Sequence, residues 1–184
     1  MFEIIRRILT YSRYLTLGLM DAGLTTLSIL CATYLTGITD GREIFRLAMG
    51  VGIGIAASNF SGAYLAEGAE TGKELARIES VMGLKRGALR ATAMEEKLKH
   101  KALDRSLINS LSAFFGIALA IFPMLFIKFP YSYFYGFMAA TTQIVLLGVY
   151  IGRMGKSDVL ASIAKVLAVS FAVIVINVIF SIFN

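Results

Sequence analysis

The chain has 184 residues, of which 57% are hydrophobic and only 16% are charged. A soluble domain carries about a quarter charged residues, so the composition excludes an ordinary water-soluble fold. The net charge of +6 is compatible with nucleic-acid binding, but the basic residues cluster between apolar stretches, which is typical of membrane topology.

The chain begins with a short amphipathic segment, residues 1–13. Its apolar side chains recur at helical spacing, and its arginines fall largely off that face. We expect a helix that lies in the membrane interface, with a frayed tail as the alternative. The segment lacks the apolar core and small-residue cleavage site of a signal peptide.

Five stretches of the chain are nearly free of charge and have about the length, ~20 residues, that a helix needs to cross a bilayer. The expected fold is therefore all-α and polytopic, with five transmembrane helices. Residues 14–66 supply helices 1 and 2, and residues 106–184 supply helices 3 to 5. The individual spans are 14–37, 47–66, 106–127, 129–152 and 159–184. Pro123 and Pro130 lie where they can end the third span.

The insertion between the second and third spans, residues 67–105, has seven acids, nine bases and no proline. Its good helix formers, interrupted by Gly83 and Gly87, predict a helical hairpin of residues 67–82 and 88–104. The first helix would continue the second span, and the second would lead into the third.

Basic residues are concentrated on one side of the predicted membrane. They lie before the first span, in the hairpin and between the fourth and fifth spans, whereas the other side carries only Arg42, Arg46 and Lys128. The positive-inside rule then places the N-terminus and the hairpin in the cytosol and the C-terminus outside. A prokaryotic plasma membrane is the expected location.

Asp21 is an acid within the first span, where a carboxylate costs about 2.5–3.5 kcal/mol on insertion scales. It lies seven residues from the inner end of its span, as does Asn59 in the second span, and Gln143 lies nine from the inner end of the fourth. The three polar groups, with Met20 beside Asp21, are candidates for the lining of one transport path. The alternative is an aspartate that only pairs with a neighbouring helix.

The second span carries small residues at strict four-residue spacing: Gly50, Gly54, Ser58 and Gly62. Such a face lets another helix approach closely. The partner helix would belong to the same protomer or to a second copy.

Glu67, Glu70 and Glu74 follow the second span and fall on one helical stripe. With Glu95, Glu96 and His100 on the opposite hairpin helix, and thioethers from Met82 and Met94, they are a candidate collecting site for a transition metal. The alternative is a solvated face with ordinary ion pairs between residues one turn apart.

No sequence pattern indicates an enzyme. The chain lacks Ser-His-Asp and Cys-His sets and a phosphate loop, and its one cysteine, Cys31, lies in the first span. We therefore expect a membrane transporter with no resident cofactor.

The stretch Met20-Asp21-Ala22-Gly23-Leu24-Thr25-Thr26 resembles the Asp-Gly-Leu-Thr signature in the first span of the vacuolar iron transporter family, which includes the nodulin-21-like proteins. The end of the second span, residues 58–66, is similar to that family's Ser-Met-Gly-Leu-Gly-Gly-Tyr-Leu-Ala. Five spans with a helical insert after the second also match, so the resemblance covers most of the chain.

The resemblance implies a homodimer that exchanges cytosolic Fe²⁺ or Mn²⁺ for protons, as a short prokaryotic-type member. Asp21 would be the translocating acid, and Asn59 stands where the family has methionine, a departure that favours the harder Mn²⁺. Glu74 and Glu79 correspond to glutamates of the family's helix below the second span, with Glu67 and Glu70 near its acidic segment and Glu95 and Glu96 as later candidates.

The expected function is thus proton-coupled export of a divalent transition metal from the cytosol. The alternative is a non-transporting membrane protein whose basic hairpin binds anionic lipid or a protein partner.

Overall fold

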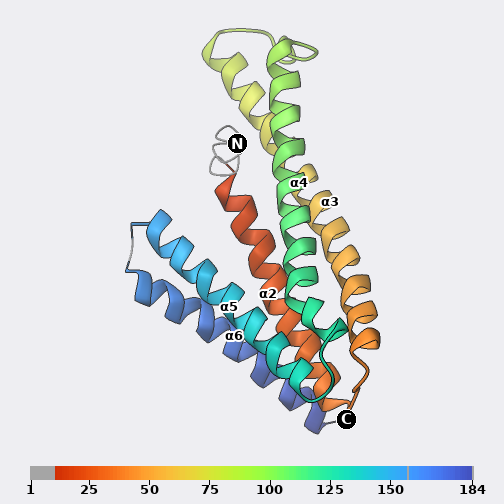
Figure 1. The fold of residues 1–184 in the computed structure, drawn as a ribbon. Helices are drawn as coiled ribbons and strands as arrows, with labels where there is room; N and C mark the ends of the chain where they lie inside the picture. The colour runs from red at the N-terminus through yellow and green to blue at the C-terminus, as the bar shows by residue number, and fades with distance from the viewer. Residues whose placement is uncertain (1–10, 157, 184) are drawn as a thin grey trace.

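The computed structural model describes residues 11–156 and 158–183, and this part of the chain is all-α (Figure 1). It contains five α-helices and one 3-10 helix. In chain order these are α2 (Ser12–Leu35), α3 (Gly41–Val81), α4 (Ala93–Ile121), η1 (Phe122–Leu125), α5 (Tyr131–Met154) and α6 (Val159–Ile182). The predicted fold class is confirmed. The interfacial helix predicted for residues 1–13 lies almost wholly outside the described residues.

All five α-helices are long and apolar enough to cross a membrane. Three of them have 24 residues each, about 36 Å at 1.5 Å per residue. Helix α3 has 41 residues and rises about 60 Å, twice the thickness of the hydrocarbon layer. Part of α3 is therefore too long to lie within the hydrocarbon layer, and the boundary at Ala66 stays a prediction.

Helix α4 is the centre of the bundle. It packs against α3 over most of its length and against α2 on another side, while α5 and α6 pair with each other and lean on α2. Figure 1 shows α3 and α4 running side by side past the other helices, at the same end as the start of α2. The end of α6 lies at the opposite end of the bundle.

Two groups of buried side chains form the core. The first joins α2, α3, α4, η1 and α5, and the second joins α2, α4, α5 and α6. Between them, small residues allow close helix approach. At Gly18 of α2, an added Cβ would lie 2.0 Å from Ser112 Oγ and 2.2 Å from the backbone oxygen of Asn109 on α4. Here the helices approach too closely for any side chain.

The chain turns at the outer end of the predicted third span, as its two prolines suggest. Pro123 lies in η1, directly after α4, and Pro130 precedes the first residue of α5. Because proline lacks a backbone N–H, it is tolerated at a helix start but not in a helix interior. The prediction that these residues end the span is confirmed.

The tip of the hairpin differs from the sequence prediction. The second hairpin helix begins at Ala93, not at residue 88. Gly83, Gly87 and Ala91 have positive φ angles of 66°, 90° and 58°, a conformation that interrupts a helix. The carboxylate of Glu79 accepts hydrogen bonds from the backbone N–H groups of Gly87 (2.8 Å) and Leu89 (2.9 Å), so the loop is tied to α3 instead of coiling into α4.

Candidate transport site

Asp21 of α2 and Asn59 of α3 are in direct contact. The Asn59 side-chain amide donates to Asp21 Oδ2 at 2.8 Å, although the residues are 38 positions apart. Counting from the inner ends of two antiparallel spans placed these groups at one depth, and the hydrogen bond confirms that placement. Among the described residues, Asp21 forms no salt bridge, so its charge is met only by an amide dipole.

The Asp21 side chain is exposed on the surface of the protomer, and Asn59 is partly exposed. A carboxylate that faces hydrocarbon is costly, and such groups normally face a bundle interior or a water-filled cavity. The described part of the protomer leaves the Asp21 side chain exposed.

The small-residue face of α3 is also open. Gly50, Gly54 and Gly62 have no heavy atom within 4 Å of an added Cβ, and Ser58 is exposed. Of the two partners that the sequence allowed, packing within the protomer is wrong, because the α3 residues buried against α4 lie on another face, at Ala48 and Gly52. Packing of this face on a second copy stays a prediction.

Gln143 and Met20 do not join the Asp21–Asn59 pair. The Gln143 amide donates to the backbone oxygen of Leu19 at 3.2 Å and lines a groove of about 1070 Å³ between α2, α4 and α5. Met20 packs against the second core group. Gln143 thus has the predicted depth, two residues from Asp21 along α2, but lies on a different side of that helix.

The hairpin glutamates are spread over separate contacts. Glu67 is buried and pairs with Arg105 of α4, whose guanidinium also lies over the ring of Tyr14. Glu70 and Glu74 are exposed. Within the described residues, no group of three His, Cys, Asp or Glu side chains is arranged to hold a metal ion. A collecting site would therefore need a second protomer or a rearrangement.

The remaining hairpin acids have structural partners. The backbone N–H groups of Leu89 and Gly87 hold the pKa of the Glu79 carboxyl below its ordinary value. Glu95 pairs with Lys99 at 2.9 Å and accepts from the backbone N–H of Ala91 at 2.6 Å; these contacts lower its pKa as well. Glu96 lies 3.9 Å from His100, and both are exposed. Met82 and Met94 are exposed too.

Sequence reasoning missed the role of Arg105. It was counted only as one of nine hairpin bases, yet it joins three helices through Glu67 and Tyr14 at the membrane exit. The available signal was that Glu67 and Arg105 stand at the two ends of the predicted insertion. Antiparallel helices bring the ends of an insertion together.

We expect Glu67→Gln to lower the free energy of unfolding by about 1–3 kcal/mol, because the substitution leaves the Arg105 guanidinium without its carboxylate. Glu70→Gln is the matched control: the same change one turn along the helix, at an exposed side chain, should leave stability within about 0.5 kcal/mol. Thermal unfolding in detergent, followed by circular dichroism at the helix band, measures both. Equal shifts for the two variants would contradict a structural role for Glu67.

These features define an α-helical integral membrane protein with five apolar helices, a polar pair that joins two of them and a charged helical hairpin. The chain is similar to an uncharacterized protein of Methanocaldococcus jannaschii, with 27% identity over 165 residues that cover 90% of this chain and 85% of the relative. No family model matches the chain, and no solved structure matches it.

Proposed function

We propose that this protein exports a divalent transition metal, Fe²⁺ or Mn²⁺, from the cytosol in exchange for protons. The observation that carries the proposal is the Asp21–Asn59 pair, a carboxylate on a membrane-spanning helix that is held by an amide and not by a cation. A carboxylate without a counter-ion binds either a proton or a metal ion. Competition between the two for one site couples their movements.

The geometry of the pair suits this exchange. Asn59 occupies one oxygen of Asp21 as a hydrogen-bond donor, which leaves the other oxygen for a metal or a proton. The amide oxygen of Asn59 is a further hard ligand. Carboxylate and amide oxygens favour Mn²⁺ among the transition metals. The resemblance to the vacuolar iron transporter family in the first two spans supports the same assignment.

A homodimer is part of the proposal. Asn59 lies about 60° around α3 from Gly62 and about 100° from Ser58, so a second copy packed on the small-residue face would reach the exposed Asp21 from the Gly62 end of that face and bring two Asp21–Asn59 pairs to one interface. Two carboxylates and two amides provide up to four oxygen donors, a more complete ligand set than one protomer offers. Exposed Asp21 and the open glycine positions support this arrangement independently.

Liposome transport tests the function. Purified protein is reconstituted with a pH-sensitive dye inside, and Fe²⁺, Mn²⁺, Zn²⁺ and Ca²⁺ are compared under the same gradient. We expect proton movement with Mn²⁺ and Fe²⁺ that stops when a protonophore dissipates the gradient. Liposomes that show no metal-dependent proton movement would favour the alternative, a non-transporting protein that acts through its basic hairpin.

Metal preference is expected to follow residue 59. In Asn59→Met a thioether replaces the amide, so the ratio of Fe²⁺ to Mn²⁺ transport should rise several-fold, because a softer ligand favours the softer ion. Asn59→Leu, which offers no donor atom, is the control and should lower transport of both metals. The two variants are compared by initial rates in the same liposome assay. An unchanged ratio in Asn59→Met would mean that residue 59 is not a ligand.

The proposed direction of transport requires a cytosolic hairpin and an extracytosolic C-terminus. A reporter protein fused after Asn184 should be extracytosolic, and one inserted beside Gly87 at the hairpin tip should be cytosolic. The bases of the hairpin, retained on the inner side, are the physical cause. Paired alkaline phosphatase and fluorescent-protein fusions at each site read the two sides. A cytosolic C-terminus would contradict both the topology and the direction of export.

A further inference from the structure

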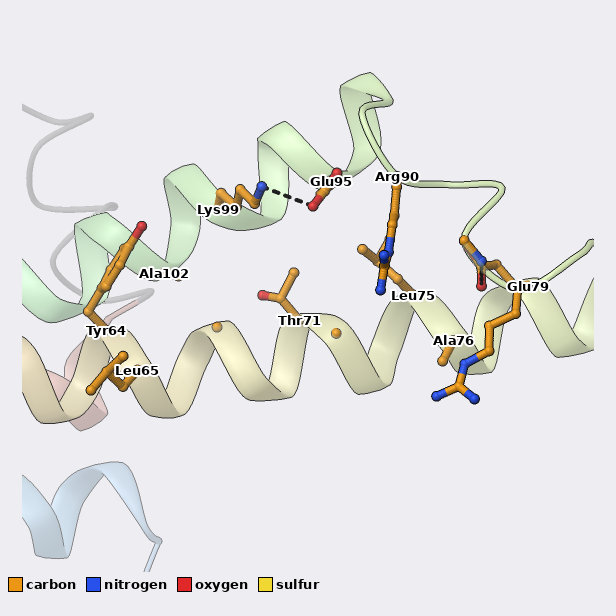
Figure 2. A pocket seen from close by; sticks show the side chains of 14 residues that line it. Tyr64, Leu65, Thr71, Leu75, Ala76, Glu79, Arg90, Glu95, Lys99 and Ala102 are labelled. Atoms are coloured by element: carbon orange, nitrogen blue, oxygen red, sulfur yellow. Dashed lines mark hydrogen bonds and ion pairs between the residues drawn. The ribbon is translucent and has the colours of Figure 1, made fainter.

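The hairpin encloses a pocket that the proposed transport function does not use. It has a volume of about 600 Å³ and lies between the extension of α3 and the start of α4, beneath the loop of residues 82–92 (Figure 2). Ligand pockets for small molecules fall in the range of about 300–1,000 Å³. The pocket is thus large enough for a small organic ligand.

The floor of the pocket is open because α3 carries glycine there. Gly68 and Gly72 both line the pocket, and an added Cβ at either would meet no heavy atom within 4 Å. Two glycines in a helix interior each cost about 1 kcal/mol relative to alanine. The open space beside Gly68 and Gly72 thus comes with a lower helix stability than alanine at these positions would give.

Thr71 supplies an unused hydrogen-bonding group. It is 8% exposed, lines the pocket and forms no side-chain hydrogen bond with any described residue. Thr16, Thr33 and Thr36 elsewhere return their hydroxyls to backbone oxygens one turn back. Figure 2 shows Thr71 standing on α3 in the space between that helix and Lys99. The Thr71 residue is largely buried, but its hydroxyl is not among the fully buried side-chain oxygens that lack a partner, so it is open to the pocket and available to a ligand there.

Three cations line the same pocket: Arg86, Arg90 and Lys99. Lys99 is paired with Glu95, whereas Arg86 and Arg90 form no salt bridge among the described residues. The two lining carboxylates already accept backbone hydrogen bonds, Glu79 from two N–H groups and Glu95 from one. The donors left over in the pocket are thus two guanidinium groups and one hydroxyl.

We propose that this pocket binds a soluble organic phosphate. Guanidinium groups form paired, charge-assisted hydrogen bonds to phosphate oxygens, and the Thr71 hydroxyl would donate a further bond. Leu75, Ala76 and Ala102 form an apolar wall suited to the organic part. A bare inorganic ion would leave that wall and much of the volume unfilled.

One end of the pocket reaches Tyr64 and Leu65, within the predicted second span, whereas the end that carries the arginines lies away from the predicted membrane. Leu75 lies nine residues and Glu79 thirteen residues beyond the end of the predicted span at Ala66, or about 13 and 20 Å along the helix. The headgroup region of one leaflet is only about 5–8 Å thick. The pocket cations therefore lie beyond the reach of a phospholipid headgroup in the bilayer.

Calorimetry of the purified full-length protein in neutral detergent, with chelator present to exclude metals, tests this site. The soluble probes are ADP and pyrophosphate, and the lipid arm uses nanodiscs with and without phosphatidylglycerol. We expect ADP to bind and Arg86→Gln/Arg90→Gln to weaken binding at least tenfold. Thr71→Val, which keeps the shape and removes the hydroxyl, should weaken it several-fold.

The matched control is Lys73→Gln/Arg77→Gln, which removes the same charge from exposed α3 positions outside the pocket. This control should retain wild-type affinity, and circular dichroism verifies that all variants are folded. Three results would overturn the proposal. These are equal weakening by both double variants, binding of neither soluble probe, and binding that appears only with phosphatidylglycerol. Because the assay contains no transported metal, its outcome is independent of the transport measurements.

Discussion

Asp21→Asn is expected to abolish metal-coupled proton movement in liposomes, with a loss of at least 100-fold in initial rate. Asparagine has nearly the same shape as aspartate and can still contact Asn59, but it neither binds a proton near neutral pH nor offers a metal a negative charge. The protein should remain folded, because the one side-chain hydrogen bond that Asp21 forms with a described residue is exposed. Fluorescent reporting of internal pH during a Mn²⁺ gradient measures the effect.

Two further variants locate the cause of that loss. Asp21→Glu keeps the carboxylate on one added methylene and should retain part of the rate. Gln143→Leu removes a polar group of similar depth from a different side of α2 and should leave proton coupling intact. Wild-type coupling in Asp21→Asn would show that Asp21 is structural. A loss in Gln143→Leu equal to that in Asp21→Asn would place the path in the other groove.

The shared depth of Asp21 and Asn59 could be predicted, whereas their contact is a finding of the structure. Every α-helix rises by the same distance per residue. Two residues that lie equally many positions from the same membrane face, on two antiparallel helices, therefore lie at the same depth. Depth alone does not say which side of a helix faces its neighbour. Gln143 is an example: it lies near the depth of Asp21, as predicted, but on a different side of α2 from Asn59.

The spacing of small residues was similarly informative about shape but not about partners. Four-residue spacing on α3 correctly indicated a smooth face, yet that face is open in the protomer. Apart from Gly41 at the start of α3, the closest contacts within the described protomer are made by glycines of other helices. Gly148 and Gly152 of α5 lie against backbone atoms of Ile163 and Val159 in α6, for example. In a membrane, helices gain little from burying apolar surface, so apolar pattern does not identify which smooth face meets which helix.

The hairpin glutamates show a third limit. Their shared stripe suggested one metal site, but each acid has a local environment that residue type does not reveal. Glu67 forms an ion pair with Arg105 across the hairpin, and Glu79 accepts hydrogen bonds from two backbone N–H groups of the loop. These partners depend on where the loop turns, and the positive φ angles at Gly87 and Ala91 set that turn.

Substitution at two glycines should separate the packing of the protomer from the packing between protomers. Gly18→Ala is expected to destabilise the protomer itself, because the new Cβ would lie 2.2 Å from the backbone oxygen of Asn109. The Ser112 side chain, which the new Cβ would also meet, can rotate away. The backbone of α4 can move away only if α2 and α4 separate. Overpacking of this kind costs about 1–3 kcal/mol or more. A marked fall in thermal midpoint and early elution as aggregate should follow.

Gly54→Leu should have the opposite signature. No heavy atom lies within 4 Å of its added Cβ, so the helix content and thermal unfolding of the protomer should be unchanged. If the small-residue face of α3 carries the dimer, leucine bulk at its middle keeps the two backbones apart, and light scattering in detergent should show monomer where the wild type shows dimer. Gly54→Ala should weaken the dimer less, because a methyl group separates the helices less than an isobutyl group. Retention of a wild-type dimer by Gly54→Leu would exclude this face as the interface. Asp21 would then need a different cover, and the two-copy metal site proposed above would be wrong.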